Sequence, residues 1–155
     1  MALLDRFLKQ TDFSSYEDFM QNYQVIVPEH FNFGYDVVDA YAATEPQKEA
    51  ILWTNDRGDV KHLNYADYKR LSDQAASYLL SLGIERGDCV MLILKRRIEW
   101  WITMVALHKI GAVAIPATHL LTDKDIIYRC HEAEIKAIVA VGDDQILRNV
   151  YAARA

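Results

Sequence analysis

Residues 89–94 read CVMLIL, and this stretch decides the fold. It is an unbroken apolar run, preceded by Arg86-Gly87-Asp88 and followed by Lys95. A strand with one face in water alternates apolar and polar residues, whereas a strand covered on both faces reads as a short continuous apolar run. Residues 89–94 therefore predict a buried strand of a parallel sheet.

Two similar runs follow, VAIPA at residues 113–117 and KAIVAV at residues 136–141. Helical patterns separate the three runs, and the second helix is capped by Thr122 with Asp125 three residues later. Strands that alternate with helices at this spacing indicate βαβ units. The predicted fold is α/β, a partial doubly wound parallel sheet. Because such sheets usually contain further strands, we expect the chain to be an N-terminal fragment of a longer protein.

Upstream of the sheet, the pattern predicts a β-hairpin and a helical arm. Residues 50–53 and 60–63 are short apolar-rich runs on either side of a turn at Asn55, Asp56 and Gly58. Asn64 then caps a long amphipathic helix. Its expected apolar stripe comprises Tyr68, Leu71, Ala75, Leu79 and Leu82. We divide the chain into an N-terminal arm, residues 1–33, and an α/β unit, residues 34–155.

The helix after the central strand lies within KRRIEWWITMVALHKIG, residues 95–111. Its apolar side chains cover most of the circumference, which is typical of a buried helix. The expected polar stripe is narrow and comprises Glu99, Thr103, His108 and Lys109. We expect Trp101 to lie in the core, so that Trp101→Ala costs about 3–5 kcal/mol.

Lys95, Arg96 and Arg97 fall at the carboxyl end of the predicted central strand. Ligands of open α/β sheets collect at that edge. The three cations either meet an anionic ligand or a charged partner segment, or simply solvate the strand-to-helix turn. Nucleic-acid binding has less support, because the chain lacks a second basic patch and its net charge is −5.

Composition places the chain among ordinary globular proteins. Its 155 residues are 52% hydrophobic and 25% charged. Cys89 and Cys130 are far apart, which predicts no disulfide framework and suits a reducing compartment. Asp5 and Arg6 interrupt a signal-peptide pattern, and the apolar stretch of residues 100–117 is too interrupted to span a bilayer. The sequence predicts a cytoplasmic protein with no membrane span and no nucleic-acid partner.

Local motifs for catalysis are missing from the sequence. There is no G-x-G-x-x-G, no G-x-x-x-x-G-K-[ST] and no G-x-S-x-G. The histidines lack H-x-x-x-H spacing, so no metal site is expected. Asp143 and Asp144 suit a helix N-terminus better than a cation site. His119 follows a strand end, but a lone histidine is more often structural than catalytic. We therefore predict no catalytic residue in this chain.

Several motifs together nevertheless resemble the start of AMP-forming acyl-CoA synthetases. They are LNYADY (63–68), LGIERGD (82–88), EWW (99–101), GAVAIP (111–116) and DIIYR (125–129). Their order and spacing are most similar to the medium-chain and acetyl-CoA-synthetase-like branch of this adenylate-forming superfamily. The resemblance extends from about Phe31 to Val141 and implies that residues 34–155 form the N-terminal part of a large adenylation domain.

The resemblance implies a ligase that converts a carboxylate to an acyl-adenylate with MgATP and then transfers the acyl group to coenzyme A. ATP, Mg and coenzyme A would serve the full-length parent, and none is expected to bind this chain alone. The implied partners are the rest of the adenylation domain, the C-terminal domain and a small carboxylic acid. Apolar faces left bare by the truncation predict self-association. The alternatives are a stand-alone non-catalytic α/β interaction domain and a free-standing nucleotide-binding module.

The resemblance also implies one candidate site, the segment after the GAVAIP strand, which in relatives helps to line the coenzyme A nucleotide site. Its residues here are Pro116, Ala117, Thr118, His119 and Leu120. Some relatives have Gly and Gln where this chain has Ala117 and Leu120, which removes a polar contact. In the alternative interpretation, Thr118 and His119 only complete a strand-to-loop turn.

Overall fold

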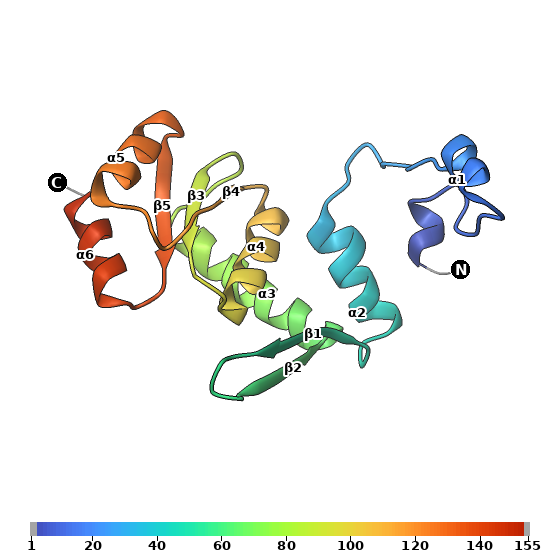
Figure 1. Cartoon of the computed structure of the whole chain (residues 1–155), viewed down its shortest axis with the longest axis horizontal. Coiled ribbons are helices and arrows are strands. Elements are labelled where there is room, and N and C mark those ends of the chain that lie inside the picture. Colours follow the sequence, from blue (N-terminus) through green and yellow to red (C-terminus); the bar gives the residue numbers. More distant parts are fainter. Residues whose placement is uncertain (1–2, 154–155) are drawn as a thin grey trace.

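A computed structural model of the chain describes residues 3–153 (Figure 1). The helical elements are η1 (Leu3–Arg6), α1 (Tyr16–Asn22), η2 (Gly34–Asp39), α2 (Ala40–Thr44), α3 (Tyr65–Ser81), α4 (Ile98–Ile110), α5 (Asp123–Glu132) and α6 (Asp144–Ala152). The strands are β1 (Glu49–Thr54), β2 (Val60–Asn64), β3 (Cys89–Ile93), β4 (Val113–Pro116) and β5 (Ile135–Ala140).

The centre of the protein is a parallel sheet with the strand order β4-β3-β5. Val90 of β3 lies opposite Ala114 of β4 and Ala137 of β5, and the register continues evenly to the end of each pair. Residues 90–93 of β3 are almost completely buried. The continuous apolar run therefore predicted both the buried strand and its parallel neighbours, and that prediction is confirmed.

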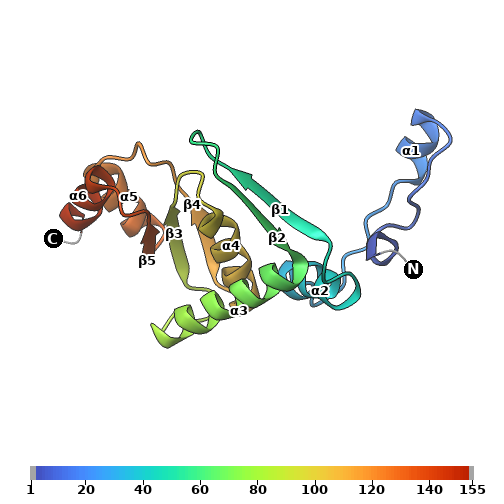
Figure 2. The ribbon, with the colours of Figure 1, turned by 90° about the horizontal axis from the view of Figure 1, so that it is seen from below.

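Helices cover both faces of this sheet (Figure 2). On one face, Val90 and Leu92 pack with Leu79 of α3 and Leu107 of α4. On the other face, Met91 and Ile93 pack with Ile126 of α5 and Ile146 of α6. Successive residues of β3 thus serve two different cores, because side chains alternate across a strand. The predicted partial doubly wound α/β fold is confirmed.

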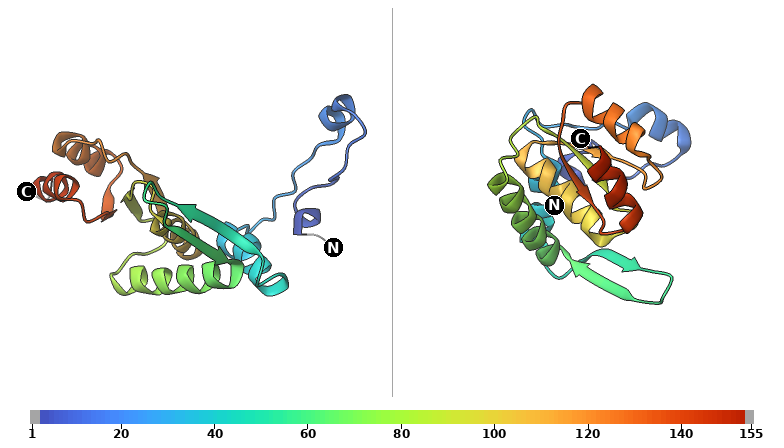
Figure 3. Two further views of the ribbon diagram at one scale, coloured as in Figure 1. Left: turned by 60° about the horizontal axis from the view of Figure 1, so that its bottom comes forward. Right: turned by 90° about the vertical axis from the view of Figure 1, so that its left-hand side faces the viewer.

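The hairpin predicted upstream is also present. Strands β1 and β2 pair antiparallel, and Asn64 caps α3 by accepting a hydrogen bond from the Asp67 amide at 2.8 Å. The two views of Figure 3 show the hairpin projecting from the end of α3, apart from the parallel sheet. A third core cluster joins it to the body, with Val38 of η2, Tyr68 of α3 and Val105 of α4 at its centre.

Helix α4 is deeply packed, but two predictions about its faces are wrong. Trp101 is 50% exposed, while Thr103 and Lys109 of the supposed polar stripe are 9% and 6% exposed. Trp100 instead packs against the core of α3, α4 and β3. The Trp101 side chain remains half in water, although its backbone carbonyl accepts a hydrogen bond from the Tyr68 hydroxyl.

The burial of Lys109 is explained by two carboxylates from distant elements. Its Nζ lies 2.7 Å from an oxygen of Asp39 and 2.5 Å from an oxygen of Asp73, so the charge is compensated in the interior. Lys69 pairs with the same two aspartates from a more exposed position. The aliphatic part of Lys109 packs against Gly34, where a Cβ atom would come within 2.5 Å of the lysine Cγ. The network therefore joins η2, α3 and α4.

Residues 3–33 lie to one side of the body (Figure 2). A β-bridge between Leu8 and Val25 closes this arm on itself, and Phe7 contacts Phe31 edge-on. Large apolar side chains of the arm are exposed, including Tyr16 at 70% and Met20 at 62%. The core clusters contain no residue before Val38 among those described. The division at residue 33 stays a prediction.

Candidate functional site

The carboxyl ends of the parallel strands bring three loops to one edge of the sheet. They are residues 94–97 after β3, residues 117–122 after β4 and residues 141–143 after β5. Backbone hydrogen bonds fix this edge, because the Ala117 amide donates to the Leu92 carbonyl at 2.9 Å and the Val141 amide donates to the Ile93 carbonyl at 3.0 Å. Open α/β sheets bind their ligands at this edge.

The loop after β4 contains the predicted coenzyme A lining. Leu121 anchors the loop to the protein interior, since its side chain is buried and its carbonyl accepts a hydrogen bond from the Asn149 side chain of α6 at 2.9 Å. Thr118, His119 and Leu120 are exposed, and the Leu120 amide donates to the Thr118 hydroxyl. The five residues Pro116, Ala117, Thr118, His119 and Leu120 thus form one surface segment at the expected edge. Their contact with coenzyme A stays a prediction.

The loop after β3 is joined to the start of α6. Lys95 has a positive φ of 51°, which non-glycine residues rarely adopt. Its ammonium group lies 2.8 Å from an Asp143 oxygen. The hydrogen bond from Lys95, together with those from the amides of Ile146 and Gln145, lowers the pKa of Asp143. Asp143 is the N-cap of α6, which confirms that this acidic pair begins a helix.

The hairpin packs onto the same loop, a contact that sequence reasoning missed. The Trp53 indole donates its Nε1–H to the Arg96 carbonyl at 2.7 Å. Two cavities of about 230 Å³ and 420 Å³ lie around Trp53, and both include Arg57 and Arg97 in their walls. The local pattern contains no signal for this contact, because Trp53 and Arg96 are 43 residues apart.

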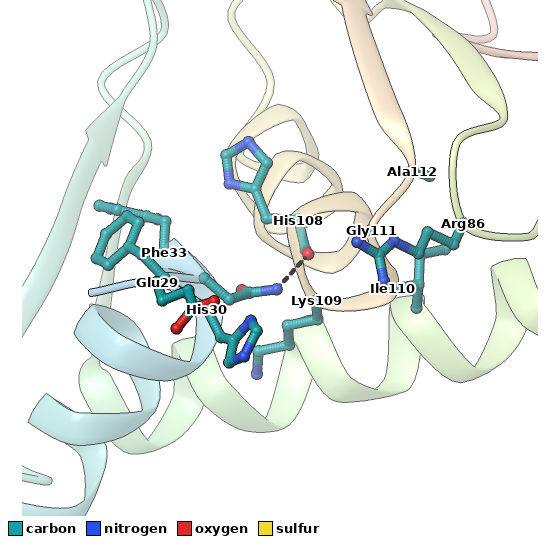
Figure 4. Close-up of a pocket in the computed structure, with 11 residues that line it drawn as sticks. Glu29, His30, Phe33, Arg86, His108, Lys109, Ile110, Gly111 and Ala112 are labelled. Atoms are coloured by element: carbon teal, nitrogen blue, oxygen red, sulfur yellow. Dashed lines mark hydrogen bonds between the residues drawn. The ribbon is translucent and has the colours of Figure 1, made fainter. Parts of the chain in front are cut away.

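A cavity of about 710 Å³ lies at the opposite end of the sheet, between residues 29–33 and the end of α4 (Figure 4). Asn32 lines it, and its side chain donates a hydrogen bond to the His108 carbonyl at 2.7 Å. Arg86, His30 and His108 contribute to its walls. In Figure 4 the rings of His30 and His108 lie on opposite sides of that hydrogen bond, so they do not form a catalytic pair.

Among residues 3–153, the Nδ1 atom of His108 is the one buried side-chain polar atom that has no hydrogen-bond partner. Its ring packs edge-on against Phe33, with the ring centres 5.9 Å apart. Burial lowers the pKa of His108 below its ordinary value of 6.5. The folded state therefore favours the neutral imidazole.

This leads to a prediction about pH. Between pH 7.5 and pH 5.5 (about one unit on either side of the ordinary histidine pKa), the unfolded chain takes up a proton at His108 that the folded chain resists. Stability is therefore fully present above the unfolded pKa and falls as the pH drops through it. His108→Phe should flatten this dependence in urea unfolding curves. An equally steep slope in His108→Phe would contradict the assignment.

No grouping of His, Cys, Asp and Glu suited to a metal ion occurs in the described part of the chain. No helix between residues 3 and 153 is both long enough and apolar enough to cross a bilayer. His62 Nδ1 lies 2.5 Å from Glu49 Oε2 on the exposed hairpin. The carboxyl edge of the sheet presents exposed loop residues and the guanidinium groups of Arg57, Arg96 and Arg97.

Comparison with known proteins gives consistent results. Residues 38–154 match the family model described as AMP-binding enzyme. Human acyl-coenzyme A synthetase ACSM3, mitochondrial, is 37% identical over 134 residues, which is 83% of this chain and 23% of that protein. Rat acyl-coenzyme A synthetase ACSM4, mitochondrial, is 39% identical over 120 residues, covering 74% of this chain and 21% of that protein.

A solved structure shows the same fold. The fatty acyl CoA synthetase of Mycobacterium tuberculosis superposes with a TM-score of 0.71 at 23% identity, over 80% of this chain and 24% of that chain. The present chain thus spans about a quarter of the length of the proteins it matches. Because the family model covers most of the residues, including all three parallel strands and the loops at their carboxyl ends, the chain belongs to the AMP-binding enzyme family.

Proposed function

We propose that this chain is the N-terminal part of the adenylation domain of an AMP-forming acyl-CoA ligase. The observation that carries the proposal is the family match over residues 38–154, combined with the parallel sheet that those residues form. The reaction joins a carboxylate, ATP and coenzyme A to give an acyl-CoA, AMP and pyrophosphate. Formation of an acyl-adenylate makes this possible, because it converts a poor electrophile into a mixed anhydride with a good leaving group.

Within that reaction, the chain supplies framework and one binding surface. The longer polypeptide supplies the groups that hold ATP and Mg during adenylation. The loop Pro116–Leu120 contributes to the coenzyme A side, where the exposed Thr118 hydroxyl and His119 ring offer polar contacts. Support comes from the position of this loop at the carboxyl edge of the sheet.

Partners follow from the surfaces that this structure leaves open. Strands β4 and β5 are the two edges of the sheet. Exposed apolar side chains include Leu120 at 76%, Tyr128 at 66% and Tyr151 at 60%. We propose that the remaining adenylation and C-terminal domains cover such surfaces in the longer polypeptide, and that copies of the isolated chain associate through them. The cytoplasmic location stays a prediction, and the two curated relatives above carry the word mitochondrial in their names.

The experiment is a chimera in which this chain replaces the matching segment of human ACSM3. We expect carboxylate-dependent exchange of pyrophosphate into ATP, which reports adenylation, and we expect acyl-CoA formation. The isolated chain should catalyse neither step. In the chimera, the double change Thr118→Ala, His119→Ala should raise the KM for coenzyme A and leave pyrophosphate exchange unchanged.

Two outcomes would contradict the proposal. Pyrophosphate exchange by the isolated chain would show that the rest of the longer polypeptide is not needed for adenylation. A chimera that is soluble and unfolds cooperatively, yet lacks exchange with every carboxylic acid tested, would show that the chain does not serve as this part of a ligase.

A further inference from the structure

Three arginines without carboxylate partners gather at one corner of the carboxyl edge. Arg57 of the hairpin turn and Arg96 and Arg97 after β3 line one cavity beside Trp53. Across residues 3–153, none of the three guanidinium groups has an ion pair or a hydrogen bond, whereas Arg6 and Arg70 each pair with an aspartate. Unused guanidinium donors that share a cavity are available to a ligand.

The charge of this corner opposes that of the whole protein. The walls of the two cavities around Trp53 contain the cations Arg57, Lys61, Lys95, Arg96 and Arg97 and the anions Asp56 and Asp59. Lys95 is compensated by Asp143, which leaves an excess of positive charge in a chain whose net charge is −5. Like charges held close together repel, and a bound anion relieves that repulsion.

The backbone that carries these arginines is well anchored. The Asn55 side-chain oxygen accepts hydrogen bonds from the amides of Arg57 and Asp59, both at 3.0 Å, which fixes the hairpin turn. The Trp53 indole fixes the carbonyl of Arg96, and Lys95 holds its positive φ of 51° beside them. A non-glycine residue in this region costs free energy and persists where its surroundings hold it. The corner is therefore an ordered structure with free donors.

We propose that this corner binds a phosphate-bearing anion, with Arg57, Arg96 and Arg97 as the donors. The planar fork of a guanidinium group matches two oxygens of a phosphoryl group. The cavity that the three arginines share is small, about 230 Å³, and suits a compact tetrahedral anion better than an acidic polypeptide, which needs an extended basic stripe. The proposal goes beyond the ligase function and does not depend on it, because it rests on the charge and geometry of this corner.

The test is a titration of the full 155-residue chain with pyrophosphate at low ionic strength, followed by calorimetry and by tryptophan fluorescence. We expect saturable binding that weakens as chloride is added. Arg57→Gln and Arg97→Gln should each weaken binding about tenfold, the effect of losing a charge-assisted hydrogen bond. Arg129→Gln makes the same charge change on the exposed face of α5 and should leave the affinity unchanged. Melting curves verify that each variant is folded.

Parallel titrations with coenzyme A and with ATP identify the source of the phosphate. Tighter binding of either one that is lost in Arg97→Gln would assign its phosphate to this corner and support the proposal. The proposal is overturned if pyrophosphate does not bind, or if Arg129→Gln weakens it as much as Arg57→Gln does. Polyglutamate that binds more tightly than every phosphate compound, through the same arginines, would identify an acidic protein partner and would also overturn it.

Discussion

The double variant Asp39→Ala, Asp73→Ala should lose about 3–5 kcal/mol of its free energy of unfolding, because it leaves a buried ammonium group without an anion. The side chain of Lys109 is 1% exposed and both of its ion-pair partners are these aspartates. Burial raises the pKa of Asp73, but hydrogen bonds from Lys109 and Lys69 outweigh burial, so this pKa is lower than usual. The ion pairs therefore persist at neutral pH. A domain of this size is stable by about 5–15 kcal/mol, so the loss is large.

Adding Lys109→Met to the double variant should recover most of this loss. The triple variant has no buried charge at this position, and methionine fills nearly the same volume. Lys69→Met is the matched control, because Lys69 contacts the same two aspartates but its side chain is 44% exposed; it should cost at most about 1 kcal/mol. Urea unfolding monitored by circular dichroism measures all four proteins. A triple variant as unstable as the double variant would show that lost packing, and not unpaired charge, explains the effect.

The sequence was most informative where a pattern depends only on neighbours in the chain. The run CVMLIL identified β3, because a strand covered on both faces has no polar positions. Asn64 and Thr122 identified the starts of α3 and α5, because a capping side chain bonds to an amide only three residues later. Short loops then limited the three strands to a parallel arrangement.

Pattern reasoning failed where the decisive partner is distant in the sequence. Lys109 was placed on a polar stripe, yet its partners Asp39 and Asp73 are 70 and 36 residues away. In α3, Tyr68 and Leu79 are buried as predicted, but Ser72 and Ala76 are buried more fully than the predicted Leu71 and Ala75, and Leu82 is 58% exposed. The elements that pack against a helix decide which positions beside its apolar stripe become buried, and the sequence of the helix alone does not contain that information.

In the candidate site, too, the features set by neighbours in the chain were predicted, whereas the contacts between distant residues were not. The carboxyl edge of the sheet and its cationic loop follow from strand order and direction, so Lys95, Arg96 and Arg97 were located correctly. The approach of Trp53 and Arg57 could not be predicted, because the hairpin reaches this loop only through tertiary packing. Surface loops collect binding residues from several elements, which makes the composition of a site harder to predict than its position.

The last prediction compares two residues of α4. Leu107→Ala should cost about 2–5 kcal/mol, because Leu107 is completely buried between α3 and β3 and its truncation leaves a cavity. Trp101→Ala removes a larger side chain but should cost only about 1–2 kcal/mol, since roughly half of the ring already lies in water in the folded state. The expected order is therefore the reverse of the order of side-chain size.

Equilibrium unfolding in urea measures the free energy that each variant loses, and Trp100→Ala is the matched control. Trp100 has the same side chain one position earlier and packs against the core, so its truncation should cost more than that of Trp101. If Trp101→Ala proved as costly as Leu107→Ala, the exposed indole would have to be covered in solution by another surface. Self-association measured by light scattering would then be the first explanation to test, because a second copy of the chain is the one partner present in that experiment.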